Sequence, residues 1–267
     1  MKTGLVLSGG GVMGAAHAGA IKAIIDNNIK IDAVCGTSAG AIAGLLFASG
    51  RKNAYENFLN DFRSLGFTNK TTLILKRNDV IFSQFEKILR KNVGVKRFSD
   101  LEIDFSCVAT NIVNGEMVLL KQGDPVTAVM ASSAYPGAFP IQEINGKYFV
   151  DGGLTNNFPV SVLKNKGMDF IIGSFLYNLE NIDKKFSAKK HKMNPVEIAI
   201  RSVDIMSSVI AKKEAEDCDF CFTPPVEKYS WYEFDQFDKI INVGKKYGAA
   251  NAKKMIRKIE LAKQKIS

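Results

Sequence analysis

A serine at the centre of a glycine-flanked pentapeptide is the first candidate for chemistry in this chain. The pentapeptide reads G-T-S-A-G, with Ser38 in the middle. A short apolar run at residues 33–35 predicts a buried strand before it, and residues 41–48 favour a helix after it. Strand, sharp turn and helix form the setting of a nucleophile elbow, in which Gly36 and Gly40 leave room for a strained turn. The pattern therefore predicts Ser38 as a nucleophile above the positive end of a helix, which favours a developing oxyanion. The alternative for this pentapeptide is a turn in which small residues serve only close packing.

A serine nucleophile also needs a base, and here the better candidate is a carboxylate. The two histidines are poorly placed, because His17 falls in the helix after a glycine loop and His191 in a lysine-rich stretch. Neither follows the serine at a strand end, as the α/β-hydrolase order requires. Asp151 ends a predicted strand and precedes Gly152 and Gly153, so its carboxylate can reach a facing hydroxyl. The alternative for this aspartate is an ordinary turn before two glycines.

A glycine loop at residues 9–14, G-G-G-V-M-G, follows the first predicted strand and precedes a helix. The same letters satisfy the G-x-G-x-x-G fingerprint of dinucleotide binding, which would make the protein an oxidoreductase. That function needs an acidic residue at the end of the second strand to bind the ribose. The chain has C-G-T-S at residues 35–38 in that place, and Asp32 lies at the opposite end of the strand. The mismatch disfavours dinucleotide binding.

The order of the predicted elements positions these motifs in an α/β fold. The first ~40 residues form strand, loop, helix, strand, turn and helix, which implies a parallel sheet. The predicted strands are residues 2–8, 32–35, 104–110, 117–121, 141–144, 147–150, 169–175 and 218–223. The predicted helices are residues 15–28, 41–48, 54–65, 83–92, 125–133, 195–211 and 239–266. Asp124 is the expected cap of one helix, and N-G pairs at residues 114–115 and 145–146 indicate hairpins. We expect residues 67–82 to be irregular and residues 178–194 to form a polar, basic loop or lid.

Length and composition predict one domain in a reducing compartment. With 267 residues, of which 46% are hydrophobic, the chain suits a single domain over residues 1–267. We expect a motif-bearing core of about residues 1–175 and a helical, basic C-terminal part of about residues 195–267. No apolar run approaches the ~20 residues that span a bilayer, and the first residues enter a strand without a secretory signal. The four cysteines are scattered, and the C-x-x-C of Cys218 and Cys221 lacks further zinc ligands, so these thiols are expected to be structural. We therefore expect a cytoplasmic protein that can attach peripherally to a membrane.

The net charge of +9 is concentrated in two basic patches. Residues 184–192 carry five lysines, and residues 239–265 carry nine Lys or Arg residues against one acid, Glu260. A basic surface attracts phosphate, either of nucleic acid or of anionic lipid, and the alternative is a solvated face. In the second patch, apolar residues recur at helical spacing from Ala252 to Ile266 and include no Trp or Phe. We expect this helix to pack on the core and to present its lysines outward.

Three motifs occur together and in order: the glycine loop, the G-T-S-A-G pentapeptide, and D-G-G at residues 151–153. This combination resembles the patatin-like phospholipase family, in its minimal, bacterial-type domain. Further stretches are similar to the family at residues 108–111 (V-A-T-N), 131–140 (A-S-S-A-Y-P-G-A-F-P) and 151–160 (D-G-G-L-T-N-N-F-P-V). The resemblance covers the chain from Met1 to about Phe175 and is weak beyond. The three motifs together are highly specific, although each alone is not.

The resemblance implies an α/β fold with a mainly parallel central sheet, helices on both faces and a Ser-Asp dyad without histidine. Ser38 would attack an ester carbonyl. Asp151 would accept its proton, directly or through a water, and would later assist deacylation. Backbone N–H groups of Gly9, Gly10 and Gly11, chiefly the last two, would hold the tetrahedral oxyanion. The other motif positions are Gly14, Gly36, Gly40, Gly152 and Gly153.

The activity implied by this resemblance is that of a lipid acyl hydrolase, which cleaves carboxylic esters of phospholipids or lysophospholipids. Such a dyad requires no metal and no organic cofactor, and no nucleic acid partner is expected. One position departs from the family, which usually has Lys or Arg where this chain has Met13, so the loop lacks a positive charge. A catalytically idle, membrane-binding or regulatory protein with the same fold is the alternative. The intact motif positions disfavour it.

Overall fold

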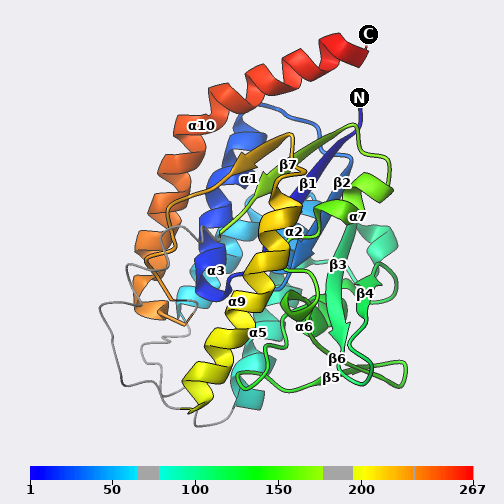
Figure 1. The fold of residues 1–267 in the computed structure, drawn as a ribbon, viewed down its shortest axis with the longest axis vertical. Helices are drawn as coiled ribbons and strands as arrows, with labels where there is room; N and C mark the ends of the chain where they lie inside the picture. Colours follow the sequence, from blue (N-terminus) through cyan, green and yellow to red (C-terminus); the bar gives the residue numbers. More distant parts are fainter. Residues whose placement is uncertain (65–77, 177–194, 231, 267) are drawn as a thin grey trace.

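The computed structural model describes residues 1–64, 78–176, 195–230 and 232–266, which form a central sheet covered by helices (Figure 1). The strands are β1 (Thr3–Leu7), β2 (Ala33–Thr37), β3 (Asp104–Asn111), β4 (Met117–Leu120), β5 (Gln142–Ile144), β6 (Lys147–Asp151), β7 (Phe170–Ser174) and β8 (Phe220–Phe222). The α-helices are α1 (His17–Asp26), α2 (Ala39–Ala48), α3 (Ala54–Ser64), α5 (Asn78–Val93), α6 (Pro125–Ser132), α7 (Val160–Asn165), α9 (Pro195–Ala215) and α10 (Phe237–Ile266). Short 3-10 turns lie at η1 (Gly11–Ala16), η2 (Phe98–Asp100), η3 (Gly152–Leu154) and η5 (Phe234–Gln236). No helix of the described ranges is long and apolar enough to cross a membrane.

The sheet is mainly parallel, as predicted. Its strand order is β5-β6-β3-β2-β1-β7-β8, and β4 pairs with β3. The run β3-β2-β1-β7-β8 is parallel, whereas β4, β5 and β6 join by antiparallel pairing. The two N-G hairpins form at the expected places, because Gly115, Asn145 and Gly146 adopt the positive φ values that tight hairpin turns demand.

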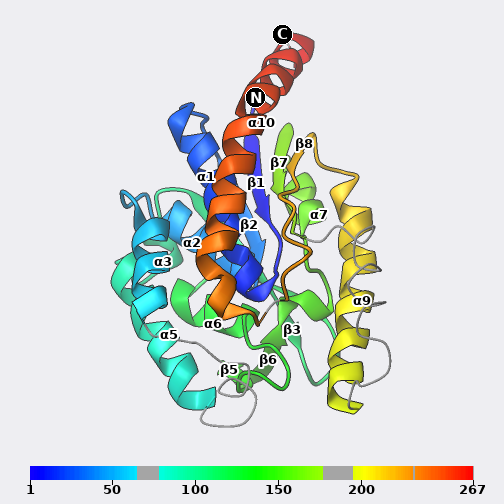
Figure 2. The ribbon, with the colours of Figure 1, turned by 90° about the vertical axis from the view of Figure 1, so that its left-hand side faces the viewer.

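Helices cover both faces of the sheet, as predicted. Alternate residues of β1 point to opposite faces: Leu5 and Leu7 pack with α1, α2 and α10, whereas Val6 packs with α7 and the buried side of α9. Figure 2 shows α7 and α9 on one side of the strands and α1, α2 and α10 on the other. The C-terminal part of the chain therefore joins the same core, through β8 at the sheet edge and through α10.

The helix α10 packs against α1 by close backbone contact. A side chain on Gly19 of α1 would collide with the carbonyl oxygen of Gly244, and one on Gly248 would collide with the carbonyl oxygen of Gly19. Further along α10, Met255 and Ile259 are buried, whereas most of the lysines are exposed. This confirms the prediction that the apolar stripe packs on the core and the lysines point outward.

Several boundaries differ from the predictions. The helix expected from residue 15 is preceded by the turn η1, because Gly11 has a φ of 55°, which starts a tight turn before regular helix begins at His17. The helix expected from residue 83 starts earlier, at Asn78, and α9 runs on to Ala215. Asp124 caps α6 as predicted, since its carboxylate accepts from the Val126 N–H at 2.9 Å. Most of the stretch expected to be irregular, residues 67–77, and the expected loop or lid at residues 178–194 lie outside the described residues.

Candidate active site

The register of β3 brings the ends of two other strands together. Val108 of β3 pairs with Thr37, the last residue of β2, and the next residue, Ala109, pairs with Asp151, the last residue of β6. Since β4 occupies the opposite edge of β3 over the same residues, β2 and β6 share one edge and meet end to end. The residue that follows β2 is Ser38. The sheet therefore carries the predicted nucleophile and the predicted base to the same point.

Ser38 has the backbone geometry of a strained elbow. Its φ is 53° and its ψ is −122°, a combination that a residue with a side chain rarely adopts. Close backbone contacts surround this turn, because a side chain on Gly36 would collide with the carbonyl oxygen of Gly40, and one on Gly40 with that of Leu7. The N–H of Ser38 donates to the Ser132 hydroxyl at 2.9 Å. Strain of this kind persists only where the surrounding structure enforces it, which is typical of functional sites.

Asp151 is almost fully buried, and only one of its two carboxylate oxygens is paired. Its Oδ1 accepts from the Gly153 N–H at 2.7 Å, whereas Oδ2 has no hydrogen-bond partner among the described residues. Burial raises the pKa of Asp151 from 3.8 to about 6; the Ser38 hydroxyl and the Gly153 N–H act in the opposite direction, and Asp204 adds to the rise. A buried carboxylate with a raised pKa and a free lone pair is suited to accept a proton near neutral pH.

The glycine loop contributes unpaired backbone donors next to Ser38. The N–H of Gly9 donates to the carbonyl oxygen of Asn157 at 3.0 Å, so it is already engaged. This corrects the expectation for Gly9 as an oxyanion donor. Among the described residues, no group accepts a hydrogen bond from the N–H of Gly10 or of Gly11. These two glycines stand at the start of the turn η1 and line the same pocket as Ser38. The first N–H groups of a helical turn have no partner within the turn, so these two can bind an anion.

His17 is a buried structural residue. Its Nδ1 lies 2.8 Å from the Ser174 hydroxyl and its Nε2 lies 2.9 Å from the carbonyl oxygen of Ser8. Because only an N–H can approach a carbonyl oxygen in this way, the proton is on Nε2, and Nδ1 accepts from Ser174. Burial lowers the pKa of His17 to about 4, so the ring is neutral. His17 connects the end of β1 to the end of β7 and does not line the pocket. The other histidine, His191, lies outside the described residues.

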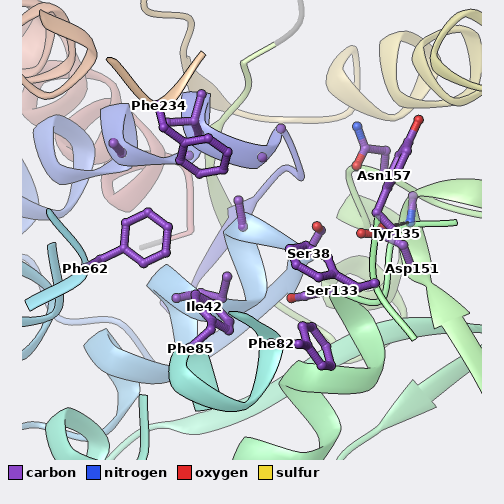
Figure 3. A pocket seen from close by; sticks show the side chains of 18 of the residues that line it. Ser38, Ile42, Phe62, Phe82, Phe85, Ser133, Tyr135, Asp151, Asn157 and Phe234 are labelled. Carbon is purple, nitrogen blue, oxygen red and sulfur yellow. Dashed lines mark hydrogen bonds between the residues drawn. The ribbon is translucent and has the colours of Figure 1, made fainter. Parts of the chain in front are cut away.

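Ser38 and Asp151 line a pocket with one aromatic end and one polar end (Figure 3). Its apolar lining comes from α2, α3, α5, the start of α10 and nearby loops: Ile42, Phe58, Leu59, Phe62, Ile81, Phe82, Phe85, Phe139, Phe234 and Phe237. Several of these rings contact each other, such as Phe62 with Phe85 at 5.9 Å between centroids. The polar end is formed by Ser133, Tyr135, Asn157, Asp204 and Ser207. The pocket therefore joins the polar groups around Ser38 and Asp151 to an apolar, aromatic surface of the kind that binds hydrocarbon groups.

Some residues around this centre were missed by the sequence analysis. Ser132 accepts from the Ser38 N–H and donates to the carbonyl oxygen of Val108 at 2.6 Å, so it fixes the elbow to β3. Asp204 of α9 accepts from the Tyr135 hydroxyl at 3.0 Å. Ser132 lies in the motif-like stretch 131–140, which could have drawn attention to it. Asp204 lies in a helix outside every motif, so no signal in the sequence pointed to it.

The motif positions that need a small residue are explained by contacts. A side chain on Gly14 would meet the Cβ of Ala39, and one on Gly152 would collide with the carbonyl oxygen of Val108. Met13, at the position where a cation was expected from the resemblance, is buried. Asp32, the acid required by the dinucleotide alternative, binds the Thr3 N–H at 2.8 Å at the far end of β2. It is therefore remote from the glycine loop.

The chain is similar to much longer proteins. It is 29% identical over 281 residues to "Lysophospholipase NTE1" of Pyricularia oryzae, which covers 92% of this chain and 18% of that protein. It is 28% identical to "Lysophospholipase NTE1" of Saccharomyces cerevisiae, covering 92% of this chain and 16% of that protein. A "patatin-like phospholipase domain-containing protein" of Caenorhabditis elegans is 27% identical, with 92% and 20% covered. The chain thus spans a fifth or less of the length of these relatives.

Among solved structures, VipD from Legionella pneumophila is similar with a TM-score of 0.46 and 16% identity, covering 90% of this chain and 67% of that one. ExoU of Pseudomonas aeruginosa, in complex with SpcU, is similar with a TM-score of 0.40 and 17% identity, covering 81% and 52%. The chain also matches a family by sequence. The model of the patatin-like phospholipases matches residues 5–164, a range that includes Ser38, Asp151 and the glycine loop. The chain belongs to the patatin-like phospholipase family.

Proposed function

We propose that this chain is a lipid acyl hydrolase in which Ser38 is the nucleophile and Asp151 the base. The observation that carries the proposal is the end-to-end meeting of β2 and β6, which brings the strained Ser38 and the buried Asp151 into one pocket lined by aromatic rings. Membership of the family supports the same reaction class.

Each step of the proposed reaction uses a group that the site supplies. The Ser38 Oγ attacks the ester carbonyl carbon while Asp151 Oδ2 takes the hydroxyl proton. The negative charge that develops on the carbonyl oxygen is held by the N–H groups of Gly10 and Gly11. The intermediate collapses, the alcohol leaves with the proton from Asp151, and the acyl group stays on Ser38. A water then attacks the acyl carbonyl carbon and gives a proton to Asp151. The second intermediate collapses as Asp151 returns that proton to the Ser38 Oγ, which releases the fatty acid and restores both groups.

The aromatic end of the pocket favours substrates in which the acyl group transferred to Ser38 is a long hydrocarbon chain. Burying each methylene of such a chain contributes about 0.8 kcal/mol. We propose phospholipids or lysophospholipids as substrates, in agreement with the resemblance and with the names of the relatives, which are lysophospholipases. The competing proposal is an idle, membrane-binding protein with the same fold.

A serine-reactive fluorophosphonate probe and a panel of lipid esters test the two proposals. We expect the probe to label the wild type and to leave Ser38→Ala unlabelled, because only a serine activated by a base reacts at an appreciable rate. Ser99→Ala, a change in a distant surface turn, is the matched control and should be labelled normally. Release of fatty acid from the panel must depend on Ser38. Absence of both labelling and hydrolysis would favour the idle protein.

The pH dependence of turnover should report the titration of Asp151. Its raised pKa of about 6 means that the base is protonated, and therefore inactive, below that pH. We expect kcat/KM for a soluble ester to rise about tenfold per pH unit below an apparent pKa of about 6 and to level off above it. The measurement is a pH–rate profile from about pH 4.5 to 8. A flat profile through pH 6 in an intact protein would contradict Asp151 as the base.

We also propose that the protein binds peripherally to anionic membranes through the exposed basic face of α10. The exposed basic residues of this helix are Lys239, Lys246, Lys253, Lys254, Arg257, Lys258, Lys263 and Lys265. Each basic residue near an anionic bilayer contributes about 1 kcal/mol, and the attraction decays over roughly one Debye length. The outer side of α9 exposes apolar side chains, including Met206 and Val209, which could add a contact independent of charge.

Co-sedimentation with vesicles separates these contributions. We expect binding to anionic vesicles, weak binding to zwitterionic ones, and loss of binding in high salt. Replacing Lys253, Lys254 and Arg257 together by glutamine should weaken the binding about tenfold or more. The matched control replaces three exposed lysines on other surfaces: Lys96, Lys121 and Lys147. Equal binding to both vesicle types, or no effect of salt, would mean that charge is not the anchor and that the α10 face is only solvated.

A further inference from the structure

The polar end of the pocket contains groups that the proposed reaction does not use. Asp204 lines the pocket from α9, and Tyr135 lines it from the segment after α6. The Tyr135 hydroxyl donates to Asp204 Oδ1 at 3.0 Å. Asp204 lines the same pocket as Ser38 and Asp151, and its charge adds to the rise in the pKa of Asp151 that burial causes. A second carboxylate beside a buried base is costly, which calls for an explanation in terms of the substrate.

The Asp204 carboxylate can accept a hydrogen bond from a ligand. Oδ2 of Asp204 has no hydrogen-bond partner among the described residues, while Oδ1 is oriented by Tyr135. Burial raises the pKa of Asp204 to about 6, while the Tyr135 hydroxyl and Arg201 act in the opposite direction, so the group is mostly ionised at neutral pH. Arg201 is not among the residues that line the pocket, so the charge that faces a ligand here is the carboxylate. An ionised carboxylate repels phosphate and attracts a donor such as a hydroxyl. The part of the substrate bound here is therefore a neutral, hydroxyl-bearing part.

A second, independent observation indicates a polar ligand at this end of the pocket. Ser133 lines the pocket and is 6% exposed as a residue, and its buried hydroxyl has no hydrogen-bond partner among the described residues. Ser133 and Ser38 line the same pocket (Figure 3). A buried hydroxyl without a partner loses free energy unless a ligand or a water satisfies it. Ser133 can both donate and accept, so it fits the same hydroxyl-bearing part of a substrate.

We propose that Asp204, oriented by Tyr135 and assisted by Ser133, is a specificity residue that binds a free hydroxyl of the leaving alcohol. This inference rests on the proposed acyl hydrolysis, because the leaving alcohol must point toward the polar end when the acyl chain lies against the phenylalanines. In a glycerolipid, a free hydroxyl next to the ester is present when one acyl chain is attached and absent when that position carries a second chain. The site would therefore select monoacyl over diacyl glycerolipids.

Binding of non-hydrolysable lipids tests the inference without depending on catalysis. The probes are monoalkyl ether glycerophospholipids with the hydroxyl next to the ether either free, replaced by hydrogen, or capped as a methyl ether. We expect wild-type protein to bind the free-hydroxyl lipid about 10- to 100-fold more tightly than the other two, the range for a hydrogen bond to a charged group. Calorimetry or displacement of a fluorescent lipid measures the ratio.

The ratio between lipids, rather than any absolute affinity, is the readout in the variants. In Asp204→Ala it should fall to about one, and in Tyr135→Phe it should be intermediate, because the carboxylate stays but loses its orienting donor. Asp204→Asn keeps the shape and one acceptor, so it should restore part of the ratio. Glu214→Gln, on the same helix, is the control. Glu214 holds α9 to Ser161 through bonds of 2.6 and 2.7 Å outside the pocket lining, and its variant should keep the wild-type ratio.

The outcomes separate this inference from the proposed function. A ratio near one in the wild type, or an unchanged ratio in Asp204→Ala, would overturn it. So would a preference that follows the charge of the headgroup when the hydroxyl is kept constant. If the wild type discriminates between the ether lipids as expected but hydrolyses no corresponding ester, the subsite stands and the proposed function fails. The same hydroxyl preference in kcat/KM for esters would support both.

Discussion

Ser38→Ala and Asp151→Asn are each expected to lower kcat by about 10⁴-fold or more, and the double variant should be little slower than either single one. The physical reason is that the two groups act as a unit. Without the Asp151 base, the Ser38 hydroxyl keeps its proton and is a weak nucleophile; without the hydroxyl, the base has nothing to activate. Steady-state hydrolysis of a soluble ester by the four proteins gives the double-mutant cycle.

Measurements of unfolding stability are the control for this cycle. For Asp151→Asn we expect the activity to fall but the stability to rise. The pKa of Asp151 is raised from 3.8 to about 6 in the folded protein, so between these values the native state binds a proton that the unfolded chain has lost. The stability contributed by this group is therefore complete below about pH 4 and is lost as the pH rises to about 6. At pH 7, ionised Asp151 costs about 3 kcal/mol. Asp151→Asn should thus be inactive yet more stable than the wild type in thermal or urea unfolding at pH 7.

Two results would contradict the dyad. One is near wild-type turnover in Asp151→Asn together with its loss in His191→Ala, which would make the histidine the base. The other is a double variant whose loss is the product of the two single losses, because independent groups combine in that way. A loss of activity accompanied by unfolding would not count, so circular dichroism accompanies the kinetics.

The sequence singled out Ser38 and Asp151 as candidates because each is embedded in a local pattern. Ser38 is surrounded by a strand, small residues and a helix, and these determine its turn whatever the rest of the chain does. The hairpins at Gly115 and Gly146 were predicted for the same reason, since their turns require a positive φ that few residues tolerate. The resemblance then related Ser38 to Asp151, although 113 positions separate them in the chain.

The features that the sequence did not reveal depend on register and tertiary packing. The meeting of β2 and β6 follows from their pairing with consecutive residues of β3, and neither strand encodes that register by itself. Asp204 reaches the pocket because α9 packs across the turn after β6, where Ser207 donates to the Gly153 carbonyl oxygen at 2.6 Å. The wrong expectation for Gly9 has a similar cause, because its N–H is engaged by Asn157, which is far away in the chain.

The second large effect is expected at the glycine loop. Gly11→Ala should lower kcat by about 10²- to 10³-fold and leave KM nearly unchanged, because the oxyanion that its N–H would hold exists only after the attack by Ser38. The φ of Gly11 is 55°, and an alanine at such a value adds about 1 kcal/mol or more of strain, which moves the N–H away from the reacting oxygen. Gly10→Ala should have a smaller effect in the same direction, because the added methyl group would lie 2.9 Å from the Leu176 Cδ1, the flexible end of a side chain that can move aside.

Gly115→Ala is the matched control for the strain itself. Gly115 has a φ of 74° with no atom within 4 Å of the added methyl group, and it lies in the β3–β4 hairpin, away from the pocket. The two alanine variants should therefore lose similar amounts of stability in thermal unfolding, but only Gly11→Ala should lose kcat. If Gly11→Ala keeps the kcat of the wild type while folding normally, its N–H does not bind the oxyanion. If Gly115→Ala loses as much kcat as Gly11→Ala, the effect comes from a general loss of stability and not from the loop.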